Sequence, residues 1–301
     1  MARTRTTPFR RALADGRITA VLLFLPPALL LFSFFVVLPL IEAGSYSGYK
    51  WSGYGEPTEW VGSRNFELLS THSVFRTALW NTVKIILVSG LVQVPLALGL
   101  ALLIYRKTWA NTAFRLIFFV PFIMAEVATG LIWSFVFDGD YGITAMAAEL
   151  LQTQAIYPLS DRTWAFPVVL FVIVWKYFGF HMMIFIAALQ TIPEELVEAA
   201  RIDGAKPGQV ALYIKLPLLI PALTVSLFFA VIGSLQLFDL IVPLTNGGPS
   251  NSTHTIVSYL YTFGLTRLKV GFGSAVGIVL FALCVSFALI YRNTAMRENR
   301  S

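Results

Sequence analysis

Long apolar runs alternate along the chain with shorter polar segments. Six of these runs are long enough to cross a membrane as a helix, and they lie at 18–41, 79–105, 112–137, 164–190, 214–238 and 272–291. A transmembrane helix needs about 20 mostly apolar residues to span the hydrocarbon layer of a bilayer. The pattern therefore predicts an all-α membrane protein with six transmembrane helices, in a transmembrane domain over residues 18–295.

The composition supports this fold class. Of the 301 residues, 57% are hydrophobic and only 13% are charged. Soluble domains carry about 25% charged residues, so this chain has roughly half the usual share. A soluble enzyme and a disordered chain are both excluded.

Basic residues gather at the ends of alternate apolar runs. The net charge of +6 could indicate a nucleic-acid partner, but these residues do not line one solvated face, and we expect no such partner. Loops rich in Lys and Arg stay in the cytoplasm, so we expect both termini there, with a basic cytoplasmic tail at 1–17. The basic residues on this side are Arg3, Arg5, Arg10, Arg11, Arg17, Arg106, Lys107, Arg115, Arg201, Lys206, Lys215, Arg292, Arg297 and Arg300.

The cytoplasmic loop at 191–213 has the pattern of a helical hairpin. Thr191 and Glu194 have the spacing of a capping box, which predicts a helix with Pro193 in its first turn that continues through residues 194–203. Gly204 suits the left-handed position that ends a helix, and Pro207 suits the first turn of a second helix. A regular amphipathic hairpin on this side of the membrane predicts a protein partner.

This hairpin carries a specific motif. The chain reads Glu198-Ala199-Ala200, then three residues, Gly204, nine residues, and Ile-Lys-Leu-Pro at 214–217. That pattern resembles the EAA loop in the membrane subunits of binding-protein-dependent ABC importers. Phe238-Asp239 and the Leu-Thr-Asn-Gly-Gly-Pro run at 244–249 are similar to the sugar-uptake branch of that family, the maltose-type permeases.

The resemblance implies an importer-permease fold in the bacterial inner membrane. It implies half of a translocation pathway for a sugar or oligosaccharide, with glycerol-phosphate import and ion-coupled secondary transport as alternatives. The implied partners are a second homologous permease, two ATPase subunits that bind ATP and Mg, an extracytoplasmic substrate-binding protein and membrane lipid. The residues that would contact the ATPase are Glu198, Ala199, Ala200, Asp203 and Gly204.

No motif in the sequence indicates catalysis. The chain has no G-x-x-x-x-G-K-[ST] phosphate loop and no H-E-x-x-H zinc motif, and His72, His181 and His254 are scattered along it. We therefore expect no enzymatic activity, no metal site and no cofactor in this chain. His181, within the fourth span, is expected to hydrogen-bond between helices.

Ionisable residues inside membrane helices are costly, and so they are functional candidates. Glu126 and Lys176 lie at similar depths in the third and fourth spans, which predicts an ion pair that either lines the translocation path or is purely structural. Gln236, Phe238, Asp239 and Asn246, near the outer end of the fifth span, could recognise sugar hydroxyls and ring faces. Alternatively, Asp239 braces the Gly-Gly-Pro turn.

The outer loop at 42–78 is rich in aromatic residues. These are Tyr46, Tyr49, Trp51, Tyr54 and Trp60. Such rings favour the headgroup layer of a bilayer, and they could also stack on a sugar.

Overall fold

A computed structural model describes residues 17–298 of the chain. The regular secondary structure in this range consists of helices, apart from one isolated β-bridge between Tyr49 and Trp60. All but the last residue of the predicted basic tail at 1–17 lies outside the described residues.

Most helices follow one another through short links, and the longer links lie at 47–63 and 151–164. Among the described residues the α-helices are α2 (Arg17–Phe32), α3 (Leu38–Tyr46), α4 (Arg64–Thr71), α5 (Ser73–Val88), α6 (Val94–Ile104), α7 (Trp109–Ile123), α8 (Glu126–Val136), α9 (Ile143–Leu150), α10 (Ala165–Leu189), α11 (Glu194–Ile202), α12 (Pro207–Val210), α13 (Leu216–Leu218), α14 (Ile220–Gln236), α15 (Ile241–Thr245), α16 (Ile256–Tyr259) and α17 (Val270–Glu298). Wider π-helical turns lie at η1 (Ser33–Val37), η2 (Ser89–Gln93), η3 (Ala211–Lys215) and η4 (Leu260–Leu265).

Four helical segments are long and apolar enough to cross a membrane. They are Ala20–Tyr46, Ser73–Ile104, Ala165–Leu189 and Val270–Asn293. Two further crossings are bent: α7 meets α8 at 98°, and Pro207–Leu218 meets Ile220–Gln236 at 66°. If each bent pair is one crossing, the total is six, as predicted. The predicted spans at 112–137 and 214–238 are thus not continuous helices.

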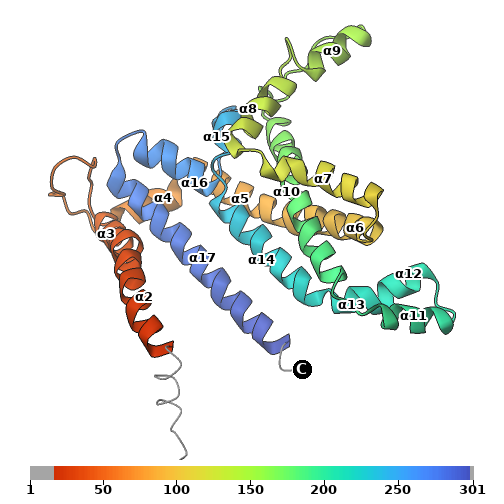
Figure 1. Ribbon diagram of the computed structural model, residues 1–301. Helices are drawn as coiled ribbons and strands as arrows, with labels where there is room; N and C mark the ends of the chain where they lie inside the picture. Colours follow the sequence, from red (N-terminus) through yellow and green to blue (C-terminus); the bar gives the residue numbers. More distant parts are fainter. Residues whose placement is uncertain (1–16, 299–301) are drawn as a thin grey trace, which may run out of the picture.

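Helix α10 lies at the centre of the fold, against α6, α7 and α14 (Figure 1). Its buried residues lie on all sides, as expected for a helix that is apolar all round. One apolar cluster packs α10 against α6 and α14, and a second packs it against α5 and α15. By contrast, α2 is covered with exposed apolar side chains, which is typical of a helix that faces lipid.

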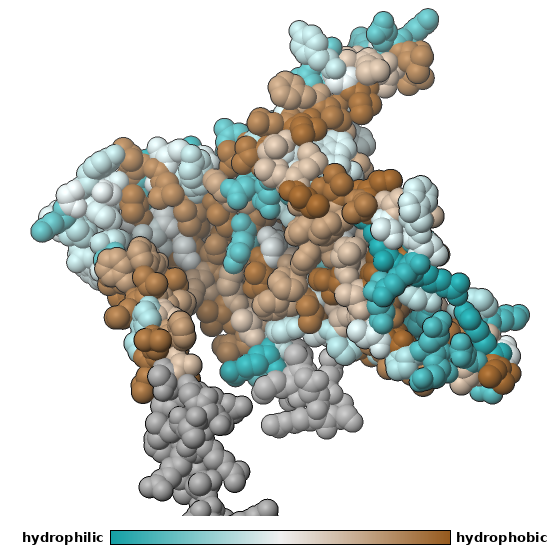
Figure 2. Space-filling model, in the orientation of Figure 1, coloured by the Kyte–Doolittle hydropathy of each residue, from teal (hydrophilic) through white to brown (hydrophobic). Residues whose placement is uncertain are grey.

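The two ends of the bundle differ. The α11–α12 hairpin projects at one end, and the start of α2 and the end of α17 point toward that same side (Figure 1). Helices α4, α9 and α15 lie toward the opposite side. The hairpin surface is largely hydrophilic, whereas brown apolar surface covers much of the bundle (Figure 2).

Candidate functional site

The α11–α12 hairpin begins without the predicted capping box, so that prediction is wrong. Pro193 takes an extended conformation with ψ 133° and immediately precedes α11. The Thr191 hydroxyl donates to the Ala188 carbonyl at 2.8 Å and accepts no hydrogen bond from the first turn of α11 among the described residues. Helix α11 begins at Glu194, with Pro193 as its N-cap and not in its first turn as predicted.

The end of α11 confirms the expected role of Gly204. This residue has φ +84°, in the left-handed region where glycine carries no Cβ penalty. The Gly204 N–H donates to the Arg201 carbonyl at 3.0 Å, and the Ala205 N–H donates to the Ala200 carbonyl at 2.9 Å. These two bonds form a Schellman motif, which satisfies the last carbonyls of α11 and reverses the chain toward α12.

The hairpin has a small apolar core, and two large apolar side chains stand out on its otherwise hydrophilic surface. Val197 and Val210 are buried, whereas Ile202 is 86% exposed and Tyr213 is 71% exposed. Of the motif residues, Ala200 is half-buried and the others are exposed: Glu198, Ala199, Asp203 and Gly204. The side chains of Ala199 and Ala200 are small, so another protein could approach the backbone closely here.

The hairpin is tied to the α6–α7 link through Tyr105. The Lys215 ammonium donates to the Tyr105 hydroxyl at 2.7 Å and lies 4.0 Å from the centroid of its ring. Arg115, on α7, donates from Nε and Nη2 to the Ile104 carbonyl at 3.0 and 2.7 Å. Contacts therefore run from the chain after α12 to the end of α6, and from there to the middle of α7.

Lys176 holds the break between α7 and α8. Met124 and the next residue are extended, so the helix stops at Ile123 and restarts at Glu126. The Lys176 ammonium, on α10, donates to the Met124 carbonyl at 2.7 Å and to the Pro121 carbonyl at 3.3 Å, and its side chain is only 1% exposed. It thus supplies donors to carbonyls at the break.

The predicted Glu126–Lys176 ion pair is wrong. Within residues 17–298 no ion pair joins the two side chains. Glu126 instead accepts a hydrogen bond from the Tyr177 hydroxyl at 2.7 Å. As the first residue of α8, Glu126 also lies where the helix dipole favours a negative charge.

The other candidate path residues lie at the end of α14 and around α15. Gln236 ends α14 and is exposed, and Phe238 packs edge-to-face on Tyr261 with centroids 5.1 Å apart. Asp239 is exposed. The structure thus pairs Glu126 with Tyr177, a residue that the sequence analysis missed. A tyrosine within a span is itself an intramembrane polar group, so the rule applied to Lys176 could have found it.

The Gly-Gly-Pro turn is braced by Thr253, whose hydroxyl donates to the Gly248 carbonyl at 2.8 Å, and the segment after the turn is held by Asn81. The Asn81 amide, buried on α5, donates to the Ser252 carbonyl at 2.7 Å and to the His254 carbonyl at 3.1 Å. No hydrogen bond to the Asp239 carboxylate occurs among the described residues, so the prediction that Asp239 braces this turn is wrong. Asn246, with φ +49°, ends α15 in the left-handed conformation and is exposed.

His181 pairs between helices as predicted. Its Nδ1 lies 2.7 Å from the Ser226 hydroxyl on α14, and both side chains are buried. In the described part of the chain no three His, Cys, Asp or Glu side chains come together as a metal site.

Comparisons with known proteins agree on one class of membrane transport protein. Residues 93–299 match the family described as binding-protein-dependent transport system inner membrane component. Similar curated proteins include the sulfoquinovosyl glycerol transport system permease protein SmoG of Agrobacterium fabrum, 34% identical over 91% of this chain and 89% of that protein. The diacetylchitobiose uptake system permease protein NgcF of Streptomyces coelicolor is 32% identical over 98% of this chain and 88% of that protein.

The fold also matches a solved structure. A chain from a bacterial ABC transporter involved in the import of the acidic polysaccharide alginate aligns with a TM-score of 0.83 and 24% identity. The alignment covers 95% of this chain and 99% of that chain. At this identity the likeness establishes the shared fold.

Proposed function

Since this chain belongs to the family of binding-protein-dependent transport system inner membrane components, we propose that it is the permease subunit of an ATP-driven ABC importer and forms half of its sugar pathway. The observation that carries the sugar assignment is the similarity, over about nine-tenths of the chain, to permeases named for the uptake of glycosides and sugars. The lactose transport system permease protein LacF of Rhizobium radiobacter is a further example, at 32% identity. The chain lies in the bacterial inner membrane as a multi-pass protein.

The α11–α12 hairpin is the surface that receives an ATPase subunit. Glu198, Ala199, Ala200, Asp203 and Gly204 form the contact, and the small side chains admit a close approach. The exposed Ile202 supports this assignment, because an 86% exposed isoleucine beside the motif is explained by a partner that covers it. Both termini lie on the same cytoplasmic side as the hairpin.

The sugar path runs past the break between α7 and α8. Glu126, Asp239 and Gln236 supply polar groups for sugar hydroxyls, and Phe238 supplies an aromatic face. Asn246 lies at the outer entrance. Lys176 stabilises the backbone of the path, since its ammonium donates to two backbone carbonyls at the break.

Uptake of an anionic glycerol phosphate has less support in this geometry. An anionic substrate favours an accessible cation in the path, and the cation at the break is Lys176. Its side chain is 1% exposed and already bonded to the backbone. A neutral sugar or oligosaccharide therefore fits these residues better.

The complete importer contains a second homologous permease, two ATPase subunits and an extracytoplasmic substrate-binding protein. ATP and Mg bind the ATPase subunits, and this chain carries out no bond chemistry. Closure of the ATPase subunits would move the hairpins and shift the permeases between inward-facing and outward-facing states, a population shift driven by nucleotide.

The test is a detergent pull-down of the tagged full-length chain from its native membrane, with identification of every recovered subunit and an ATPase assay. Gly204→Val is the coupling variant. Gly208→Val is its matched control, because an added Cβ meets no atom within 4 Å at either glycine, whereas only Gly204 has a positive φ. A non-glycine residue in the left-handed region costs about 1–2 kcal/mol.

We expect to recover an ATPase and a second permease with the wild type and with Gly208→Val. With Gly204→Val we expect the ATPase to be lost. Recovery of the wild-type chain without any ATPase would contradict the importer function. Retention of the ATPase by Gly204→Val would contradict the role of the hairpin alone.

A further inference from the structure

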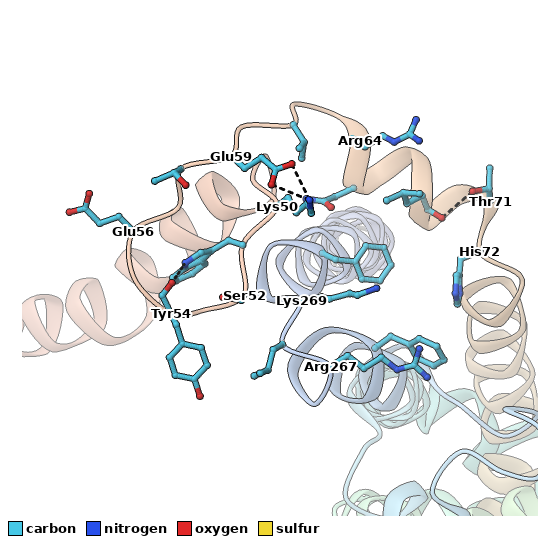
Figure 3. Close-up of a pocket in the computed structure, with 18 of the residues that line it drawn as sticks. Lys50, Ser52, Tyr54, Glu56, Glu59, Arg64, Thr71, His72, Arg267 and Lys269 are labelled. Atoms are coloured by element: carbon cyan, nitrogen blue, oxygen red, sulfur yellow. Dashed lines mark hydrogen bonds and ion pairs between the residues drawn. The ribbon is translucent and has the colours of Figure 1, made fainter.

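A large pocket lies on the side of the bundle opposite the α11–α12 hairpin. It has a volume of about 860 Å³ and lies between the loop after α3, helix α4 and the link from η4 to α17 (Figure 3). Nothing in the proposed transport path uses it. With the hairpin in the cytoplasm, the pocket opens at the outer face of the membrane.

Four basic residues line this pocket, and two of them keep an unpaired charge. Lys50 forms an ion pair with Glu59 at 3.1 Å, and Arg64 with Glu67 at 3.5 Å. Among the described residues, no carboxylate lies within ion-pair distance of Arg267 or Lys269. Glu56 and Glu59 are the carboxylates among the lining residues, so the lining keeps a net positive charge that is available to a ligand.

These two cations lie together at one end of the pocket, beside His72 (Figure 3). The Arg267 guanidinium lies 4.1 Å from the centroid of the Phe263 ring, which holds it in place. Burial, and then the charges of Arg267 and Lys269, lower the pKa of His72 from its ordinary value of 6.5. The local potential is thus positive, and it favours an anion.

The pocket lies at the boundary between polar and apolar surface. Ser73 and Val270, at its edge, begin two of the long apolar helices. Leu68 and Phe272 contribute apolar lining, and Trp51 contributes an aromatic ring of the kind enriched at membrane interfaces. A ligand here meets cations on one side and apolar surface on the other.

We propose that this pocket binds the phosphate headgroup of an anionic phospholipid of the outer leaflet, with the phosphate between Arg267 and Lys269. Arginine and lysine are the side chains that bind phosphate oxygens through charge-assisted hydrogen bonds. The pocket volume far exceeds that of a free phosphate ion, and the apolar lining suits the glycerol and the first carbons of the acyl chains. An acidic protein segment explains the cations but not the position at the start of two membrane helices.

The experiment is native mass spectrometry of the full-length chain, purified with its bound subunits and titrated with dioleoyl phosphatidylglycerol or dioleoyl phosphatidylcholine. The test variant is Arg267→Gln/Lys269→Gln. Arg267→Lys/Lys269→Arg keeps both charges and controls for folding, and Arg162→Gln controls for loss of an exposed cation on another outer loop. Each cation near an anionic headgroup strengthens binding about fivefold, so the double neutralisation should weaken phosphatidylglycerol binding about 25-fold.

The expected result is preferential binding of phosphatidylglycerol that only the neutralised variant loses. Equal binding of the two lipids, or equal loss with Arg162→Gln, would overturn the proposal. Inorganic phosphate that occupies the site as tightly as phosphatidylglycerol would overturn the lipid as ligand. Unchanged lipid binding with weakened capture of the substrate-binding protein would overturn it as well, and would assign the pocket to a protein contact.

Discussion

Replacement of Lys176 by methionine tests whether this residue holds the break between α7 and α8. Methionine is also long, unbranched and flexible, so it fills the buried site without leaving a large cavity. It cannot donate to the Met124 and Pro121 carbonyls, which the lysine contacts at 2.7 and 3.3 Å. The substitution therefore removes the hydrogen bonds and the buried positive charge while it keeps the volume of the side chain nearly unchanged.

The expected cost follows from two opposing effects. A hydrogen bond to a charged group contributes about 1.5–3 kcal/mol, and loss of the short bond leaves the Met124 carbonyl without this donor. Burial of an ammonium group carries a desolvation cost, and Lys176→Met removes that cost. We expect the bond to dominate, with a net loss of about 1.5 kcal/mol in the free energy of unfolding, since the carbonyl remains in an apolar environment.

The assay is thermal or denaturant unfolding of the purified chain in detergent, together with substrate-stimulated ATPase activity of the assembled transporter. Lys84→Met is the matched control. Lys84 is an exposed lysine on α5 that lies 5.3 Å from the Phe166 ring centroid. We expect a change of about 0.5 kcal/mol or less for this control.

Glu126→Gln tests whether Lys176 acts through its bonds to the break or through an ion pair with Glu126. The amide oxygen of glutamine still accepts the Tyr177 hydrogen bond, so this variant should be less destabilised than Lys176→Met. The two changes should also be close to additive. Equal destabilisation by Lys176→Met and Lys84→Met, or strong coupling between Glu126→Gln and Lys176→Met, would refute the reasoning.

Three further predictions concern packing and pH. Gly179→Ala should destabilise the chain by about 1–3 kcal/mol, because the new Cβ would lie against the Phe118 carbonyl, whereas Gly99→Ala, with no atom within 4 Å, should be neutral or stabilising in the same unfolding assay. Asn81→Ala should cost about 1–3 kcal/mol in that assay, because two buried carbonyls lose their donor. Burial, and then Arg267, lower the pKa of His254 to about 4, so its contribution to stability should be complete above pH 6.5 and decline as the pH falls toward 4. Melting temperatures of the wild type and of His254→Gln across this range test the last prediction, and a wild-type curve as flat as that of the variant would contradict it.

Features set by local sequence were predictable. Hydropathy alone indicates the membrane helices, because the apolar requirement applies to each segment separately. The hairpin could also be predicted, since the positive φ of Gly204 and the helix start at Pro207 depend on those residues themselves. The capping box failed because Pro193 fixes an extended conformation that turns the Thr191 hydroxyl away from α11.

The break between α7 and α8 was not predictable in the same way. Met124 and Ala125 are ordinary helix formers, and the donor that serves the break comes from Lys176, 52 residues from Met124. The depth estimate that paired Glu126 with Lys176 assumed one straight helix through this region. The 98° bend places Glu126 at the start of a new helix, where Tyr177 is its partner.

The break and the hairpin are connected through the ends of α6 and α7. Movement of the hairpin would act first on η3, where Lys215 is bonded to Tyr105 at the end of α6. Arg115 ties α7 to the Ile104 carbonyl, so a displacement of this link also acts on α7. Lys176 joins the break at the end of α7 to α10 through its bonds to the Met124 and Pro121 carbonyls. Helix α8 beyond the break packs closely on α15, because Gly130 leaves room for Pro243. Helices α8 and α15 are therefore expected to move as one unit, and Glu126, at the start of α8, accepts a hydrogen bond from Tyr177 on α10.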